Sequence, residues 1–287
     1  MLLQLCHFQN GGAKTRVGLV LAPTTVLDLT AAGVERMSSL LESEDPVAAV
    51  TQLANQKLPR FSLADVRLVS PIERQEIWAV GVTYLRSKKA RMEESDFSAN
   101  AYDRVYEAPR PELFFKCFPE KVIASGDLVG IRKDARWNVP EPELVLVINS
   151  RARIVGYSIG NDMSARDLEG ENLLYLPQAK IYDRSCAIGP WITLGGDEAT
   201  ARTWKIHLSI QRSGQIVFQG DTAVSQIKRG FDELVSYLFR SQTFPRGAVL
   251  LTGTGIVPPD DFTLKAQDII QISINGIGAL QNSVVEV

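Results

Sequence analysis

Histidine and cysteine are scarce in this chain of 287 residues, which holds 2 His and 3 Cys. His7 and His207 stand alone in the sequence. Cys6, Cys117 and Cys186 are far apart, so the spacing of a zinc site is absent. Few, scattered cysteines also argue against a disulfide framework and fit a reducing compartment. We therefore expect a cytoplasmic protein without structural zinc.

An excess of basic charge and long apolar runs are also missing. The 31 Lys and Arg face 33 Asp and Glu, for a formal net charge of −2, so we expect neither nucleic acid nor membrane as a partner. No run approaches the roughly 20 apolar residues of a spanning helix. The N-terminus, MLLQLCHFQNGG, lacks the long apolar core and cleavage site of a signal peptide. The composition is that of an ordinary globular protein.

Three carboxylates stand out within the 22 residues from Glu141 to Asp162. Glu141 and Glu143 are separated by one residue, so on a β-strand both point to the same face, and Asp162 closes the strand expected to return beside it. Carboxylates that face one another repel unless a cation lies among them. Hard oxygen ligands suit Mg²⁺, with Mn²⁺ or Ca²⁺ as alternatives. The competing interpretation is a solvated polar strand face.

The residues around this pair favour a metal site. The run 144–148 is apolar throughout, which is typical of a strand buried on both faces. Carboxylates that begin a buried strand need a compensating partner. Pro142 cannot donate to a sheet ladder, so this end of the strand is predicted to lie at an edge or bulge.

The chain divides into two predicted domains. Residues 1–70 predict a small N-terminal α/β domain, with a helix that begins at Asp45-Pro46, and residues 71–287 predict the catalytic domain. The polar segment at about 84–106 is either an exposed helix pair or a mobile lid. Beyond it the pattern is mostly β, with hairpin turns at 213–214 and 275–276 and one amphipathic helix over 227–239. We expect an α+β, mostly β fold with a β-roll or barrel-like core.

A set of short motifs follows in order from about Trp78 to Val285. They are Phe115-Lys116, Glu141-Pro142-Glu143, Gly156-Tyr157 to Asn161-Asp162, Ser164-Ala165-Arg166-Asp167, Lys180 and Thr252-Gly253-Thr254. In this order they resemble the fumarylacetoacetate hydrolase family. The resemblance implies that family's fold for the β core and Mg²⁺ on Glu141, Glu143 and Asp162. It also implies a homodimer or homotetramer and a small-molecule 2-oxo acid substrate, whose carboxylate and keto oxygens chelate the ion.

Further runs resemble the branch of the family that dehydrates 2-keto-3-deoxy pentonates. These runs are 110–116, 140–143, 171–172 and 175–182. Hydrolytic members carry Gly-x-Asn-Tyr-x-x-His, in which the His activates water, whereas this chain has Ser87 at that place, and a hydroxyl cannot serve as the base. We expect Mg²⁺-dependent dehydration to 2,5-dioxopentanoate, by abstraction of a C3 proton and loss of the C4 hydroxyl. The alternatives are an acylpyruvate-type C–C hydrolase with Glu93 or Glu94 as base, and a non-catalytic, metal-dependent sugar-acid-binding module.

Dehydration needs a base at C3 and an acid beside the C4 hydroxyl. With the resemblance in hand, Glu112 and Lys180 are the catalytic candidates, and the sequence leaves open which is which. Lys180 alternatively neutralises negative charge on the keto oxygen. Each also has an ordinary interpretation, as a surface lysine and as an ion pair of Glu112 with Arg110.

Seven further residues are candidates for substrate binding: Lys116, Tyr84, Arg166, Gln178, Thr252, Gly253 and Thr254. The last three follow an apolar run, and a glycine beside exposed N–H groups lets the backbone hold a carboxylate. A plain turn is the alternative there. Arg166 alternatively braces Asp167 beneath the metal site.

Overall fold

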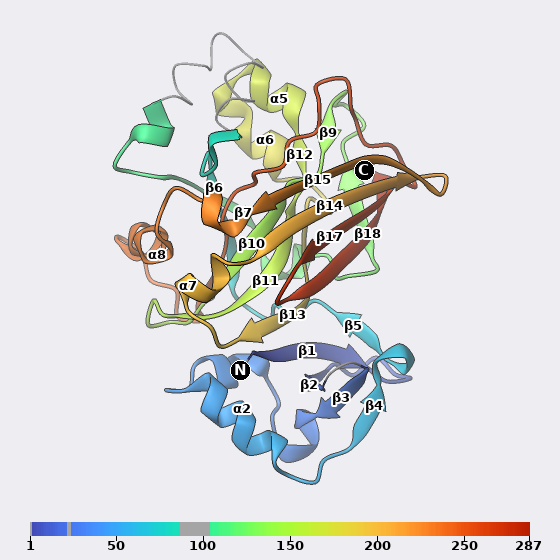
Figure 1. The fold of residues 1–287 in the computed structure, drawn as a ribbon, viewed down its shortest axis with the longest axis vertical. Coiled ribbons are helices and arrows are strands. Elements are labelled where there is room, and N and C mark those ends of the chain that lie inside the picture. The colour runs from blue at the N-terminus through green and yellow to red at the C-terminus, as the bar shows by residue number, and fades with distance from the viewer. Residues whose placement is uncertain (1, 22–23, 87–103) are drawn as a thin grey trace.

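The computed structural model describes residues 2–21, 24–86 and 104–287 (Figure 1). Most of the predicted lid at about 84–106 lies outside these ranges, and so do Ser87, Glu93 and Glu94. The described residues form two main β-sheets, with helices at their ends and a small N-terminal unit at one pole.

The larger sheet has 11 strands in the described part of the chain. They are β1 (Leu3–Gln9), β2 (Arg16–Leu21), β3 (Thr25–Asp28), β4 (Arg60–Ser62), β5 (Arg67–Val69), β6 (Glu76–Gly81), β7 (Glu112–Cys117), β10 (Pro142–Ile148), β11 (Ile154–Asp162), β13 (Cys186–Leu194) and β16 (Ala248–Leu251). Their order is β4-β3-β2-β1-β13-β11-β10-β16-β6-β7, with β5 beside β1. Strands from both predicted domains therefore share one sheet, through the antiparallel pairing of β1 with β13.

The N-terminal unit packs two helices, α1 (Met37–Leu41) and α2 (Pro46–Ala54), with strands β1 to β5. Short 3₁₀ turns, η1 (Leu29–Ala32) and η2 (Leu63–Asp65), connect its elements. The predicted start of α2 is confirmed, because the Asp45 side chain accepts a hydrogen bond of 2.9 Å from the Ala48 N–H and Pro46 lies in the first turn.

The smaller sheet has the order β15-β14-β17-β18-β8. Its strands are β8 (Leu128–Ile131), β14 (Lys205–Arg212), β15 (Gln215–Ala223), β17 (Ile269–Ile274) and β18 (Gly278–Glu286). Both predicted hairpins are confirmed. Ser213 and Gly214 have φ of 51° and 78°, the left-handed pair that a tight two-residue turn requires.

Helices and short strands of the main part lie around these sheets. They are β9 (Asn138–Val139), β12 (Ser164–Ala165), α5 (Arg166–Glu171), α6 (Leu176–Lys180), α7 (Glu198–Ala201) and α8 (Phe231–Phe239), with the 3₁₀ turns η3 (Pro119–Lys121), η4 (Leu173–Tyr175) and η5 (Val224–Gln226). The helix predicted over 227–239 begins only at Phe231. Ile227 is buried but lies before the helix. No helix among the described residues has the length and apolar character to cross a membrane.

Strand β10 lies inside the core, as its apolar run predicts. Leu144, Leu146 and Ile148 pack in one hydrophobic cluster, while Val145 and Val147 pack in another on the opposite face. The predicted mostly β fold is confirmed, and its curved sheets stay open rather than closing into a barrel.

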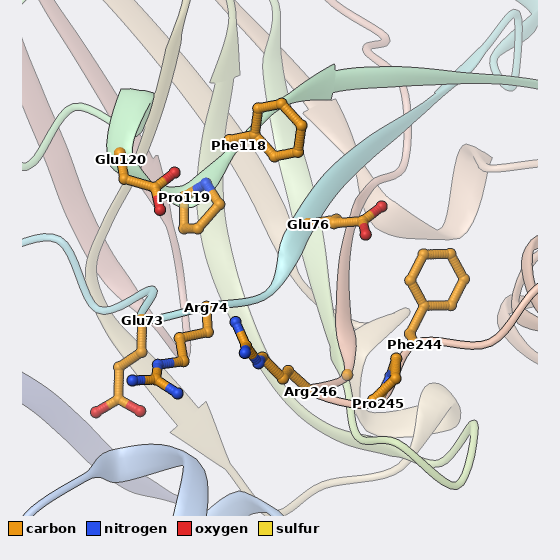
Figure 2. Close-up of a pocket in the computed structure, with 10 residues that line it drawn as sticks. Glu73, Arg74, Glu76, Phe118, Pro119, Glu120, Phe244, Pro245 and Arg246 are labelled. Carbon is orange, nitrogen blue, oxygen red and sulfur yellow. The ribbon is translucent and has the colours of Figure 1, made fainter.

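A wide surface pocket lies where the N-terminal unit meets the main part (Figure 2). It encloses about 1200 Å³ of empty space, open to solvent, and its lining includes Arg74, Glu120, Phe118 and Arg246. None of the candidate site residues lines it. The candidate metal ligands lie instead at the end of β10.

Candidate metal centre and active site

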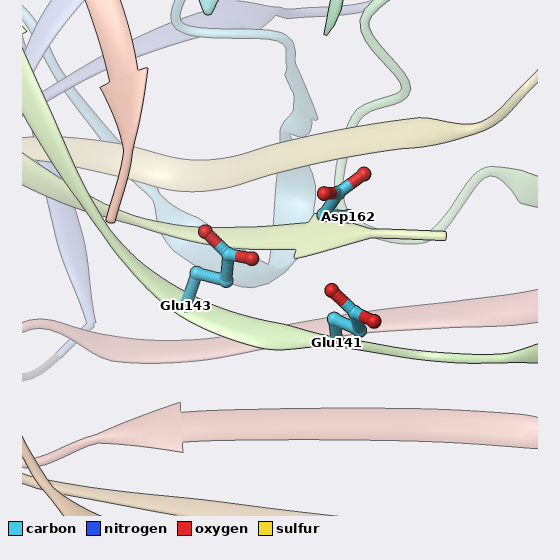
Figure 3. A group of neighbouring side chains, drawn as sticks. All are labelled: Glu141, Glu143 and Asp162. Carbon is cyan, nitrogen blue, oxygen red and sulfur yellow. The ribbon is translucent and has the colours of Figure 1, made fainter. Parts of the chain in front are cut away.

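The three predicted metal ligands meet at adjoining ends of β10 and β11 (Figure 3). Glu143 lies opposite Gly160 in the antiparallel register, and the Asp162 N–H donates a 3.0 Å hydrogen bond to the Glu141 carbonyl. All three side chains therefore point to the same face of the sheet. One carboxylate oxygen from each lies within 4.8 Å of the others, and the three residues are at most 5% exposed.

The local backbone explains why the trio lies at an open end. Strand β10 pairs with β11 from Pro142 onward, but with β16 only from Val145. Glu143 therefore has no partner in β16, and the chain segment that follows β16 contacts it instead. There the Gly253 N–H donates a 2.6 Å hydrogen bond to Glu143 Oε2. Gly253 has φ of 88°, a conformation that favours glycine.

Lys180 joins two of the three carboxylates. It is the last residue of α6 and is 2% exposed. Its Nζ lies 2.8 Å from Glu141 Oε2 and 3.0 Å from Asp162 Oδ2, and it donates to the Ser164 hydroxyl at 2.5 Å. Lys180 thus links Glu141, Asp162 and Ser164 at the site.

Lys116 and Arg166 each contact one carboxylate of the trio. Lys116 Nζ forms an ion pair with Asp162 Oδ1 and donates hydrogen bonds to the Lys180 carbonyl and, at 3.1 Å, to the Met163 carbonyl. Arg166 donates from a terminal nitrogen to Glu141 Oε1 at 3.0 Å. Both side chains are buried and orient carboxylates, which is the work of residues that support a metal site.

Glu143 differs from its two partners, because no Lys or Arg among the described residues forms an ion pair with it. Burial raises the pKa of this carboxyl well above its usual range, and the nearby charges of Asp162 and Glu141 raise it further. A divalent cation would bring Glu143 the positive charge that it lacks. The donor set of three hard oxygens also matches Mg²⁺, so the residues present fit this ion.

Glu112 faces the same cavity from β7. The cavity encloses about 370 Å³ of empty space, and its lining includes Glu112, Glu141, Asp162, Lys180, Gly253 and Thr254. Gly81 is the register partner of Glu112, and a Cβ atom there would overlap the Glu112 carboxylate. A glycine at position 81 thus leaves space for this side chain. Arg110, the ion-pair partner of Glu112 in the alternative interpretation, stacks on the ring of Tyr237, at 5.5 Å from its centroid.

The structure places the other candidate residues outside this cavity lining. Thr252 is buried, and its hydroxyl donates to the Leu144 carbonyl at 2.9 Å. Tyr84 is buried as well, and burial, followed by the charge of Glu143, raises its pKa. Gln178 is exposed on α6. Asp167 accepts from the Arg136 N–H at 2.7 Å, while Arg166 reaches Glu141.

Two residues of the site escaped the sequence argument. Ser164, whose hydroxyl contacts Lys180, belongs to a quoted motif but was given no role. Glu169 is 4% exposed and lines the cavity from α5, together with Glu112. A single acidic residue on a short helix carries no local signal of burial, so only the fold reveals it.

Comparisons with known proteins point to one family. The family model described as fumarylacetoacetate hydrolase, C-terminal, matches residues 76–285. A protein of Haloferax volcanii named probable 2-keto-3-deoxyxylonate dehydratase is 42% identical over 277 residues, which cover 92% of this chain and 93% of that protein. The 2-dehydro-3-deoxy-D-arabinonate dehydratase of Saccharolobus solfataricus is 38% identical over 255 residues, with 83% and 86% covered.

A solved structure agrees with these relatives. It is a 2-keto-3-deoxy-D-arabinonate dehydratase complexed with magnesium and 2,5-dioxopentanoate, and it matches with a TM-score of 0.79 at 33% identity. The match covers 100% of this chain and 99% of that one. The likeness therefore extends over the N-terminal unit as well as the site.

Proposed function

The chain belongs to the fumarylacetoacetate hydrolase family, as its motifs predict, and we propose that it is a Mg²⁺-dependent hydro-lyase. Its reaction is the conversion of 2-keto-3-deoxy-D-arabinonate into 2,5-dioxopentanoate and water. The observation that carries this proposal is the buried trio of Glu141, Glu143 and Asp162 beside Lys180 and Glu112. The two dehydratases that the chain resembles along most of its length support it.

The two relatives carry different substrate names, but a single substrate accounts for both. D-Xylonate and D-arabinonate differ only in configuration at C2 and C3. Both centres are lost when the acid becomes a 2-keto-3-deoxy acid, so C4 is the one stereocentre left. The proposed substrate is therefore one D-pentonate derivative, whichever sugar it comes from.

When bound by the trio, Mg²⁺ supplies a Lewis acid at the keto oxygen and a template for the 2-oxo acid head group. Glu112 takes the C3 proton, whose removal places negative charge on the keto oxygen. The Lys180 ammonium lies beside the trio and neutralises part of that charge. The Glu112 carboxyl, then protonated, delivers the proton to the departing C4 hydroxyl.

The remaining residues hold the substrate and its ligands in place. Gly253 and Thr254 line the cavity, where we expect them to contact the substrate. Lys116 and Arg166 fix Asp162 and Glu141. We assign no direct contact with the substrate to Tyr84, Thr252 and Gln178, because each lies outside the lining.

Product analysis tests this function. Purified protein with Mg²⁺ is expected to convert 2-keto-3-deoxy-D-arabinonate into 2,5-dioxopentanoate, followed by proton NMR. Release of pyruvate from a 2,4-diketo acid, with no turnover of the pentonate, would instead identify a hydrolase. Binding of the pentonate without turnover would identify a sugar-acid-binding module.

Two broader features belong to the same proposal. We place the protein in the cytoplasm, in keeping with Cys6, Cys117 and Cys186, which are free thiols in the structure. We also expect a homodimer or homotetramer, because apolar side chains are exposed on strands at the sheet edges.

A further inference from the structure

The product requires more chemistry than the loss of water from C3 and C4. That elimination leaves a C3=C4 double bond and an alcohol at C5, the compound 5-hydroxy-2-oxopent-3-enoate. The aldehyde at C5 of 2,5-dioxopentanoate forms only if C5 then loses a proton. This step rests on the proposed function, and it calls for a base at the end of the substrate far from the metal.

Glu169 lies where such a base is needed. It lines the metal-side cavity together with Glu112, and both residues also line an adjoining pocket. The other walls of that pocket are Val105, Arg110, Pro111, Leu173 and Leu176, and most of these side chains are apolar. The two carboxylates thus mark the passage from the charged metal centre to an apolar chamber.

Helix α5 links Glu169 to the trio. Arg166, at the start of this helix, is anchored to Glu141 at 3.0 Å. Glu169 follows three residues later, so it lies on the same face of the helix, about 4.5 Å further along its axis. In an extended carbon chain, C2 and C5 are about 4 Å apart. Because Glu169 lines the same cavity as Glu141 and Asp162, a substrate held at C1 and C2 by the metal site is expected to direct C5 toward it.

We propose that Glu169 is a second catalytic residue, the base that removes a proton from C5 after water has left. The C5 protons of the 2-oxo-3-enoate are acidic, because the C3=C4 bond conjugates C5 with the keto group. As Glu169 takes one of them, the electron pair moves through C4 and C3, C3 gains a proton from water, and the Glu169 carboxyl returns its proton to the hydroxide left behind. The resulting enol at C4 and C5 gains a proton at C4 and loses the hydroxyl proton, which gives the aldehyde.

Glu169→Gln tests this assignment, because it preserves shape and removes the basic oxygen. The variant is expected to consume 2-keto-3-deoxy-D-arabinonate at a rate within about threefold of the wild type, while formation of 2,5-dioxopentanoate falls at least about tenfold. The conjugated 5-hydroxy-2-oxopent-3-enoate should accumulate, detected by ultraviolet absorbance and NMR. With substrate deuterated at C5, the wild type should show a primary isotope effect on aldehyde formation.

Glu171→Gln is the matched control, since Glu171 is an exposed acid on the same helix. It should leave the product ratio unchanged. The assignment is overturned if Glu169→Gln yields 2,5-dioxopentanoate as sole product at the wild-type rate. It is also overturned if a folded variant that binds Mg²⁺ consumes no substrate, because Glu169 would then act before water loss. A wild-type protein that leaves the pentonate intact would instead refute the proposed function.

Discussion

Lys180 contacts two of the carboxylates that are predicted to bind the metal. Its Nζ contacts Glu141 Oε2 and Asp162 Oδ2. Such a lysine lowers the repulsion within the trio when the ion is absent, and it can turn toward the substrate when the ion binds. Its charge is therefore expected to be needed for turnover but not for metal binding.

Lys180→Met separates these two quantities. We expect the variant to bind Mg²⁺ as tightly as the wild type or more tightly, because a nearby cation is gone. The kcat/KM should fall by about 10²- to 10⁴-fold, since charge on the keto oxygen loses its neutralising group. Isothermal titration with Mg²⁺ and steady-state kinetics measure both. Lys121→Met, at an exposed lysine, is the control; loss of Mg²⁺ binding in Lys180→Met would contradict this account.

Gly81 tests the position of Glu112. In Gly81→Ala the new methyl group overlaps the Glu112 carboxylate, which is the far end of a flexible side chain and can move. We expect kcat/KM to fall by about 10²-fold from the displaced base, with little change in melting temperature. Gly12→Ala, where nothing lies within 4 Å of the added atom, is the control. An unchanged kcat/KM in Gly81→Ala would remove Glu112 from the reaction.

At this scale the sequence predicts that the three carboxylates meet, but not the contacts around them. Glu141 and Glu143 share a face because side chains alternate along any strand, whatever the fold. The contacts of Lys180 with Ser164 and of Arg166 with Glu141 depend on how α5 and α6 fold back over β10, and no local pattern encodes that. Thr252 illustrates the same limit, because its motif marks the cavity while its own hydroxyl bonds to Leu144.

Among the elements, α1 depends on a carboxylate from outside the N-terminal helices. Glu73 accepts hydrogen bonds from the Met37 N–H at 2.7 Å and the Ser38 N–H at 3.0 Å, and it lies 3.1 Å from His7 Nε2. It thereby satisfies two donors at the start of a helix whose own N-cap, Arg36, makes no side-chain cap bond. Burial opposes its ionisation, but the hydrogen bonds from His7 and Ser38 prevail and lower the pKa of Glu73 from 4.5 to about 2.

Glu73→Gln should therefore destabilise the protein in a pH-dependent way. Because the pKa of Glu73 is lower in the folded state, its contribution is present above about pH 4.5 and is lost as pH falls toward 2. We expect the variant to lose about 1–3 kcal/mol in the free energy of unfolding at pH 7. This loss should be smaller at pH 3.5. Urea unfolding at the two pH values measures it, with the exposed Glu35→Gln as control. An equal loss at both pH values would contradict this role.

Elements that obey local rules are predicted well. The turn at Ser213-Gly214 and the cap at Asp45 each need only a few neighbouring residues, and both form as expected. The helix expected from Ile227 begins four residues late, because Ile227 extends the apolar stripe while its backbone is extended at φ −64° and ψ 119°. Apolar periodicity records burial, and burial alone does not make a helix.

For the whole molecule, the arrangement of the strands depends on pairing between distant segments, which the sequence pattern does not predict. The pairing of β1 with β13 carries one sheet from the N-terminal unit into the metal site, since β13 also pairs with β11. Nothing in the composition of either strand specifies the other as its partner. In the described chain the larger sheet has β4 and β7 at its ends, and the smaller sheet has β15 and β8.

Self-association through β15 is the prediction that belongs to this scale. Ile216 and Val217 are 59% and 41% exposed on this edge strand, and exposed apolar edges pair with other chains. Light scattering after size exclusion should give two or four times the chain mass of 31.7 kDa. Val217→Lys should lower that mass, whereas Phe118→Ser, away from β15, should not. A wild-type mass of 31.7 kDa would contradict the prediction.

The metal requirement tests the central claim most directly. Protein stripped with EDTA is incubated with 2-keto-3-deoxy-D-arabinonate, and 2,5-dioxopentanoate is followed by NMR before and after Mg²⁺ is restored. The account predicts no product from the stripped protein and full turnover after Mg²⁺ is added, because Glu141, Glu143 and Asp162 must hold the ion for C3 to lose its proton. Undiminished turnover in the stripped protein would contradict it.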